Sequence, residues 1–310
     1  MDCEFRAGVE MNTSIVKALF SGTVLLSLPC AAIAADMDTP IFEQPVRYDP
    51  PQGEVFEEVG GNLAGFGEAS YAFGPVTSGG ISADGSRWAL RGAFNVQVDR
   101  NWNVQLDGLY NNTSVGPVTV DTLGGAGHAY YKVPDAYALG AFVQVNRFGS
   151  NALTALAPLG ADPYALDVVA GAEAAVFTGP ASFHGQLGFG RASYMGVGGD
   201  HILAKAGAKI YATDNIRFDA DGMWNRLNIL GAKIDLFTLS ATGNYRLSQI
   251  PATLFAGYQY DTVNAGAGGV TIPVADTHSF KTGLRFHFGS NSLRDEERRG
   301  PVWSTSAVSF

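Results

Sequence analysis

The chain has 310 residues, of which 46% are hydrophobic and only 16% are charged, and it contains 39 glycines. This balance suits a protein whose outer surface faces lipid, with a globular β-sandwich as the alternative. The formal net charge of -9 comes without a clustered basic face, which argues against a nucleic-acid partner. After residue 35 no apolar stretch reaches the length of a spanning helix and no Pro/Ser-rich linker divides the chain, so we predict one domain.

Residues 1–35 have the features of a cleavable signal peptide. Met11 is the expected start, because Lys17 supplies a positive region, Ala18–Leu28 an apolar run, and Ala32–Ala35 a small-residue cleavage site. A membrane anchor is the alternative interpretation, but the apolar run is too short to cross a bilayer as a helix. We therefore predict a mature chain that begins at residue 36.

The start of the predicted mature chain is acidic. Residues 36–62 carry seven acidic side chains against one arginine, and we interpret them as an acidic periplasmic N-terminal extension with the composition of a disordered segment. The alternative is a plug that is drawn into the lumen of a barrel. Cys3 and Cys30 both precede the cleavage site, so the mature chain is expected to hold no disulfide.

Residues 63–288 show a repeated period-2 alternation that predicts about twelve strands. The predicted strands lie near Leu63–Gly74, Arg87–Asp99, Trp102–Asn111, Leu123–Val133, Ala136–Asn146, Ala165–Phe177, Ser182–Tyr194, His201–Tyr211, Ile216–Asn225, Lys233–Arg246, Ala252–Asp261 and Ser279–Phe288. Most of them match the length of about 9 to 11 residues that a tilted transmembrane strand needs. The fold class we predict is all-β, a closed antiparallel up-and-down transmembrane β-barrel.

The connections between these strands are expected to alternate in length. Short ones such as Asp99–Asn101 are rich in turn formers, and longer ones include Gly149–Tyr164 and Thr262–His278. Short periplasmic turns and longer outer loops, with an even strand count, place both termini in the periplasm. In the tenth strand the apolar residues move from even positions, Ile234 and Leu236, to odd positions from Phe237 onward. This shift predicts a β-bulge near Leu236.

Aromatic residues are predicted to form two girdles around an aliphatic belt, because amphipathic rings prefer the membrane interface. The girdle near the short turns comprises Trp102, Tyr137, Phe177, Phe183, Phe218 and Tyr245, and the second comprises Tyr71, Phe73, Trp88, Tyr110, Trp224, Tyr258 and Tyr260.

Residues that alternate with these outward-facing apolar residues should face the lumen. A basic side chain in lipid near the bilayer midplane would cost roughly 2 to 4 kcal/mol. The predicted lumen-lining and selectivity residues are Glu68, Arg87, Arg91, Asp107, Lys132, Asp167, Glu173, Lys205, Lys209, Arg217, Asp219, Asp221, Arg246, Lys281 and Arg285. Many small residues lie between them, so we expect an interior too poor in bulky apolar side chains to fill itself. A lumen sealed by ion pairs, such as Lys209 with Asp219, is the alternative.

Four of these residues suggest a selectivity filter. We hypothesise that Arg87, Arg91, Lys281 and Arg285 form a basic wall where the last strands meet the first. Asp167 and Glu173 are expected to face this wall from the far side. Opposed rows of charge would favour polar solutes over apolar ones.

The last predicted strand, Lys281–Phe288, alternates polar and apolar residues up to a terminal aromatic residue. Gly283, Phe286 and Phe288 fit the pattern polar-x-Gly-x-x-aromatic-x-aromatic. This strand resembles the C-terminal insertion signal of Gram-negative outer-membrane β-barrels, and the chain from 63 to 288 resembles barrels of the porin type. Residues 289–310 follow as a periplasmic C-terminal tail, for which the sequence suggests no role.

The resemblance implies a bacterial outer-membrane channel for passive diffusion of small hydrophilic solutes or ions. It also implies contact with outer-membrane lipid and with the barrel-assembly machinery. A monomer is favoured, and a trimer is the alternative. A non-conducting structural or adhesive barrel and a barrel enzyme are the alternatives. The five histidines lack metal-like spacing, and no local signature supplies a catalytic nucleophile and base. We therefore expect no enzyme, no metal and no cofactor.

Overall fold

The structure, a computed structural model, describes residues 63–151, 154, 164–229, 231–267 and 270–303. The predicted signal peptide and acidic extension lie outside these residues. The elements are β1 (Leu63–Ser78), β2 (Ile81–Gln97), β3 (Trp102–Val115), β4 (Val118–Val133), β5 (Tyr137–Ser150), β6 (Ala165–Thr178), β7 (Ala181–Tyr194), β8 (Val197–Thr213), β9 (Ile216–Ile229), β10 (Ala232–Arg246), β11 (Ala252–Ala267), β12 (Val270–Phe288) and α3 (Leu293–Arg299).

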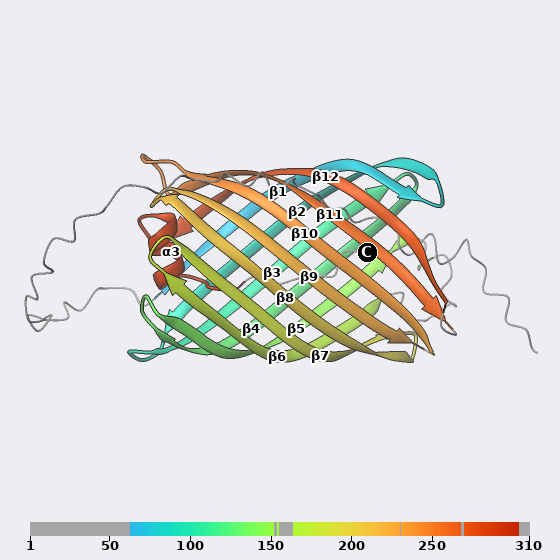
Figure 1. The fold of residues 1–310 in the computed structure, drawn as a ribbon, viewed down its shortest axis with the longest axis horizontal. Coiled ribbons are helices and arrows are strands. Elements are labelled where there is room, and N and C mark those ends of the chain that lie inside the picture. Colours follow the sequence, from blue (N-terminus) through green and yellow to red (C-terminus); the bar gives the residue numbers. More distant parts are fainter. Residues whose placement is uncertain (1–62, 152–153, 155–163, 230, 268–269, 304–310) are drawn as a thin grey trace, which may run out of the picture.

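The strands form a closed antiparallel barrel (Figure 1), which confirms the predicted fold class and strand count. Each strand pairs with its neighbours in sequence, and β1 pairs with β12 to close the sheet. The closing register sets Glu68 opposite Arg285 and Phe66 opposite His287. Closure leaves no unpaired edge, so the backbone donors and acceptors of the wall satisfy each other.

The predicted difference in connection length is wrong for several hairpins. β11 and β12 extend through most of the expected loop Thr262–His278 and leave only residues 268–269 between them. At the same end, Gly79 and Gly80 connect β1 to β2 and both have positive φ, as do Met195 and Gly196 between β7 and β8. Two positive φ values in a two-residue loop give the turn whose twist matches the flanking strands.

The predicted β-bulge near Leu236 is also wrong. β10 pairs with β9 and β11 without a break, and the register shifts lie at Val263/Asn264 and Tyr211/Thr213. Leu236 keeps its parity and is buried inside the barrel, whereas Phe237 faces outward. The apolar pattern changes parity because apolar residues fill the lumen at that level.

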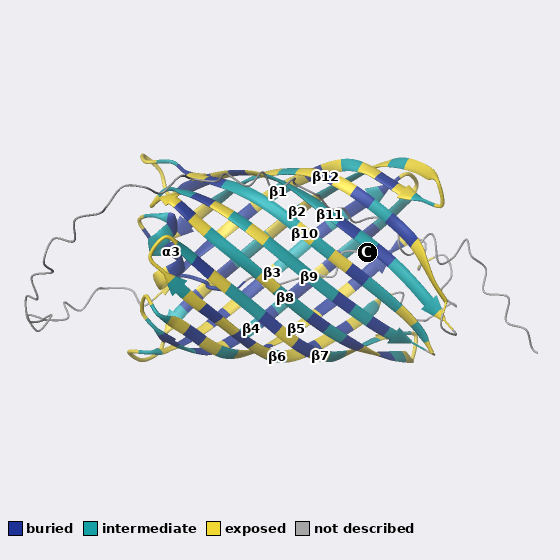
Figure 2. Cartoon of the chain, viewed as in Figure 1, coloured by how far each residue is buried: buried dark blue, intermediate teal, exposed yellow. Residues whose placement is uncertain are grey.

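Burial alternates along each strand, as Figure 2 shows. The outer face carries the aliphatic belt and two aromatic girdles. Exposed aromatics near the short turns include Trp102, Tyr137, Phe183, Phe218, Tyr245, Phe286 and Phe288, and those toward the other end include Tyr71, Phe73, Trp88 and Phe280. Phe177 was expected in the first girdle, but it faces inward, where it packs against a buried cluster that includes Trp303.

The strands are 14 to 19 residues long, longer than the roughly 9 to 11 residues that cross a bilayer. Several residues per strand therefore extend beyond the apolar band. No helix in the described ranges is long and apolar enough to cross a membrane.

The predicted tail does not simply leave the barrel. Gly289 follows β12 with φ +71, and a Cβ there would lie 2.4 Å from the carbonyl oxygen of Leu63, so only glycine fits this reversal. The chain then forms α3 at the short-turn end of the barrel (Figure 1) and returns inward as far as Trp303. Residues 304–310 lie outside the described chain.

Candidate functional site

The C-terminal plug, which we define as residues 289–303, lies in the short-turn end of the barrel (Figure 1). Ser292 caps the N-terminus of helix α3, and its hydroxyl accepts a hydrogen bond from the backbone N–H of Asp295. The first turn of α3 is acidic and its last turn holds Arg298 and Arg299, which suits the helix dipole. A seven-residue helix is marginal by itself, so contacts with the barrel must stabilise it.

The rim of the barrel holds the outer side of the plug. The backbone N–H of Leu293 donates to the carbonyl oxygen of Asp214 at 2.9 Å, and Arg294 lies 3.3 Å from the Asp214 carboxylate. Arg246 donates to the carbonyl oxygen of Ser290 at 2.6 Å. Turns and strand ends thus anchor the segment that precedes α3 and its first turn.

Deeper in the lumen, side chains of the wall bind the plug backbone. Gln105 accepts hydrogen bonds from the N–H groups of Val302 and Trp303 at 3.0 and 3.2 Å and donates to the Trp303 carbonyl at 3.1 Å. Lys132 donates to the carbonyl oxygens of Glu297 and Arg298 at 2.6 and 2.9 Å. These buried polar groups of the wall are therefore satisfied by the plug.

Trp303 provides the apolar part of this contact. Trp303 is 2% exposed, and its ring meets the Tyr130 ring edge-on with a centroid distance of 5.8 Å. Ala138, Ala175 and Val302 complete the buried cluster. The plug is thus held by apolar packing as well as by hydrogen bonds.

Two carboxylates of α3 point into the lumen. Glu297 lies 3.0 Å from Lys209, accepts a hydrogen bond from the Tyr211 hydroxyl at 2.8 Å, and accepts another from the Ser182 hydroxyl. Glu296 lies between Arg285 at 3.6 Å, Arg217 at 3.7 Å and His287 at 3.4 Å.

These surroundings determine the protonation of both carboxylates. Burial works to raise the pKa of Glu297, but the charge of Lys209 and the Ser182 hydroxyl outweigh it and lower that pKa to about 2. Burial opposes ionisation of Glu296 as well, yet contact with His287 and the charges of Arg285 and Arg217 bring its pKa well below the ordinary value. Both groups are therefore ionised at neutral pH.

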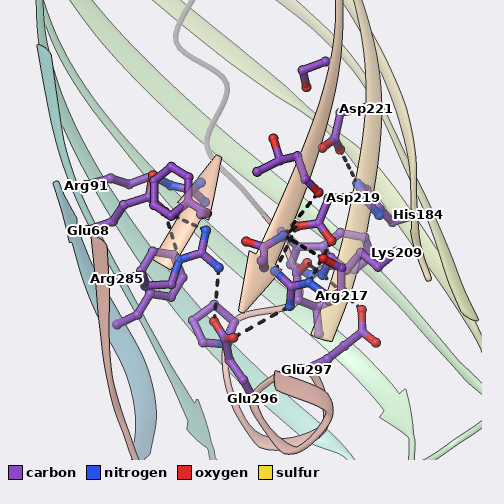
Figure 3. Close-up of a pocket in the computed structure, with 18 of the residues that line it drawn as sticks. Glu68, Arg91, His184, Lys209, Arg217, Asp219, Asp221, Arg285, Glu296 and Glu297 are labelled. Carbon is purple, nitrogen blue, oxygen red and sulfur yellow. Dashed lines mark hydrogen bonds and ion pairs between the residues drawn. The ribbon is translucent and has the colours of Figure 1, made fainter. Parts of the chain in front are cut away.

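A cavity of about 120 Å³ lies above α3 (Figure 3). Glu296 and Glu297 form part of its floor, and Val302 and Trp303 line it as well. The wall contributes mostly charged side chains: Glu68, Arg91, Lys209, Arg217, Asp219, Asp221, Lys281 and Arg285. The charged cavity and the plug that lines it form the candidate functional site.

All fifteen predicted lumen residues are buried or half-buried, on the parity opposite to the exposed belt. The predicted basic wall comes together around one acid, because Glu68 on β1 pairs in register with Arg91 on β2 and Arg285 on β12. Arg285 donates to Glu68 at 2.6 Å, and Lys281 lies 3.9 Å from it. Arg87 donates instead to Gln259 at 3.2 Å.

The acids predicted to face this wall are bound by histidines on their own side of the barrel. Asp167 lies 2.7 Å from His201 Nδ1, and Glu173 lies 2.9 Å from His128 Nδ1. Asp107 lies 3.8 Å from the other nitrogen of His128.

The remaining predicted residues lie near the plug or along β8 and β9. Arg217 binds Asp219 through two hydrogen bonds of 2.7 and 2.9 Å. The sealed-lumen alternative had paired Lys209 with Asp219, but Lys209 pairs with Glu297. Asp221 lies 3.0 Å from His184, and Lys205 is half-buried on β8.

The lumen is narrowed by apolar side chains at its other end, which corrects the expectation of an interior poor in such groups. Phe148 on β5 forms one buried cluster with Leu236, Val263 and Val274 on β10, β11 and β12. Five strands separate β5 from β11 in either direction around the barrel, so this cluster spans the lumen.

The residues of the predicted insertion signal lie at the end of β12. Phe286 and Phe288 are exposed on the outer face. Gly283 faces the lumen, where a Cβ would lie 2.3 Å from the Phe255 ring and 2.4 Å from the Ala69 carbonyl oxygen. The glycine of the motif thus has a packing role, and its role as a signal stays a prediction.

Sequence reasoning missed the plug and the wall residues that receive it, above all Gln105, Tyr211, Glu296, Glu297 and Trp303. One signal was available: Ser292 followed by acids and then arginines is the pattern of a short capped helix. In the described part of the chain, no group of three or more His, Cys, Asp or Glu residues could hold a metal ion.

Comparison with family models and with curated proteins finds no match. Among solved structures, the chain is similar to the translocator domain of the autotransporter NalP from Neisseria meningitidis, with 14% identity over 75% of this chain and 90% of that one and a TM-score of 0.44. It is also similar to the β domain of the Bordetella autotransporter BrkA, with 17% identity over 73% of this chain and 100% of that one and a TM-score of 0.45. A third similar structure is outer-membrane expressed OmpT of Vibrio cholerae, with 11% identity over 73% of this chain and 97% of that one and a TM-score of 0.42.

Proposed function

We propose that this protein is a bacterial outer-membrane channel for small hydrophilic solutes whose short-turn mouth is closed by its own C-terminal plug. The observation that carries this proposal is the plug itself. It lies outside the closed ladder of strands, it is not a wall element, and it covers a cavity lined by ten charged side chains. The C-terminal plug can therefore leave the lumen without breaking any pairing between strands.

The outer face supports the membrane location. Exposed leucines, valines and aromatic rings surround the barrel, and a large exposed apolar surface of this kind marks contact with lipid. We infer that the start of β1 and the end of β12 lie on the periplasmic side. We also infer that the barrel acts as a monomer and that the barrel-assembly machinery inserts it into the membrane.

A non-conducting barrel is the second candidate, because several lumen residues are fully buried. Tyr130, Gln105 and Val169 have no exposed surface, and the apolar cluster around Phe148 narrows the other end. In this alternative the plug would be a permanent part of the core.

Conductance in planar bilayers separates the two candidates. The mature chain is compared with a truncated barrel that ends at Phe288, and with the same truncated barrel carrying Phe148→Ala. We expect rare openings of the mature chain, frequent ohmic steps from the truncated barrel, and larger steps when Phe148 is also removed. If neither truncated barrel conducts, although circular dichroism shows that both are folded, the channel function would be excluded.

A further inference from the structure

The wall of the barrel offers two separate places for a carboxylate, and the plug fills both. The first is formed by Arg217 on β9 and by Arg285 and His287 on β12, which surround the carboxylate of Glu296. All three partners belong to the wall, whereas Glu296 belongs to the plug. The basic groups therefore remain in place when the plug leaves.

The second place binds Glu297 more completely. Lys209 supplies a positive charge at 3.0 Å, and the hydroxyls of Tyr211 and Ser182 donate hydrogen bonds. One cation and two neutral donors around a single carboxylate form a complete binding site for an anion. Figure 3 shows both glutamates rising from α3 toward the basic residues of the cavity.

The charge of the cavity depends on the plug. Five basic side chains of the lining, Arg91, Lys209, Arg217, Lys281 and Arg285, stand against five acidic ones, Glu68, Asp219, Asp221, Glu296 and Glu297. Without the plug, the same five basic groups stand against three acids. An open cavity would therefore carry excess positive charge and attract anions.

The fit of Glu296 is looser than that of Glu297. Its Oε2 atom is buried and makes no hydrogen bond of good geometry, although Arg217 and His287 lie within 3.7 Å. A buried carboxylate oxygen without a donor gives up part of its solvation free energy. A free solute, which is not tied to a backbone, can approach the same groups more closely.

We propose that small solutes bearing carboxylates bind at the positions of Glu296 and Glu297, and that the plug closes the channel by occupying the sites of its own substrates. This inference rests on the proposed channel function and names the class of solute for it. It also explains why the closing segment carries two adjacent acids on the side that faces the cavity.

The test uses the truncated barrel that ends at Phe288 and, as a full-length background, the mature chain carrying Glu296→Gln and Glu297→Gln, with succinate as the probe and neutral succinamide as its matched control. The barrel should be anion-selective in a KCl gradient. Succinate should reduce its KCl current and raise its unfolding temperature, because a ligand that binds only the folded state stabilises it. Succinamide should do neither.

Lys209→Gln is the informative variant, because the contacts of Lys209 with Glu297 and Val302 are already absent from the truncated barrel. It should weaken the effect of succinate by about tenfold, the loss expected for one charged contact. Lys233→Gln is the matched control, since Lys233 is exposed on β10, and it should leave the effect unchanged.

The outcomes separate the two proposals. A conducting barrel that responds equally to succinate and succinamide, or not at all, would overturn the carboxylate site and leave the channel intact. A silent barrel that succinate still stabilises, in a manner dependent on Lys209, would overturn the channel and leave the site. Stabilisation by succinate that Lys209→Gln does not change would place the anion elsewhere and refute the assignment.

Discussion

Closure of the channel should depend strongly on the charge of Glu297. Docking of the plug lowers the pKa of Glu297 from its ordinary 4.5 to about 2. Each pKa unit corresponds to 1.36 kcal/mol, so ionisation of Glu297 stabilises the docked plug by about 3 kcal/mol at neutral pH. Glu297→Gln removes the charge and keeps the shape, and it should shift the ratio of closed to open channels by up to roughly two orders of magnitude.

The assay is the open probability of single channels formed by the mature chain at pH 7. Asp200→Asn is the control, because Asp200 is exposed on the outer face of β8. Glu297→Gln should open the channel often, and Asp200→Asn should behave as the unmodified chain does. An open probability that Glu297→Gln leaves unchanged would refute the argument that the Lys209 contact holds the plug.

Three further perturbations should act on the plug. Trp303→Ala deletes a buried ring and should destabilise docking by roughly 3 to 5 kcal/mol, measured as increased protease cleavage after Phe288; unchanged cleavage would contradict it. Acid should open the mature chain only as the pH falls from 4.5 toward about 2, because the free carboxylate takes up a proton before the docked one does; opening between pH 7 and 5 would contradict this. Gly289→Val should raise open probability, since its Cβ would lie 2.4 Å from a carbonyl oxygen, whereas Gly179→Ala, with open space around its Cβ, should not.

The barrel could be predicted from the sequence because lipid requires each strand to alternate outward apolar residues with inward polar ones. Charged residues such as Arg91 and Lys281 must avoid lipid, so parity alone places them inside. Both lie on the inner side of the barrel. The same rule failed in β10, because a constriction puts apolar side chains such as Leu236 on the inside as well.

The partners of the inner charges could not be read in the same way. Pairing between inner side chains depends on barrel closure and on rotamers. The spacing of residues along the sequence therefore does not predict the contacts of His128 with Glu173 and of His201 with Asp167. The plug is more difficult still, because its seven-residue helix has little stability alone. Its position is set by distant groups such as Gln105, which ordinary strand patterns do not mark.

A reversible lock on the plug tests the central claim most directly. The backbone N–H of Arg294 lies 3.4 Å from the carbonyl oxygen of Asp214, and the two side chains form an ion pair of 3.3 Å, so we expect cysteines at these two positions to pair. Asp214→Cys with Arg294→Cys adds the only thiols of the predicted mature chain, and Glu297→Gln is included so that the unlocked channel opens. We predict silence under oxidising conditions and ohmic steps once a reductant is added. Equal conductance before and after reduction, with the disulfide confirmed by mass spectrometry, would contradict closure by the C-terminal plug.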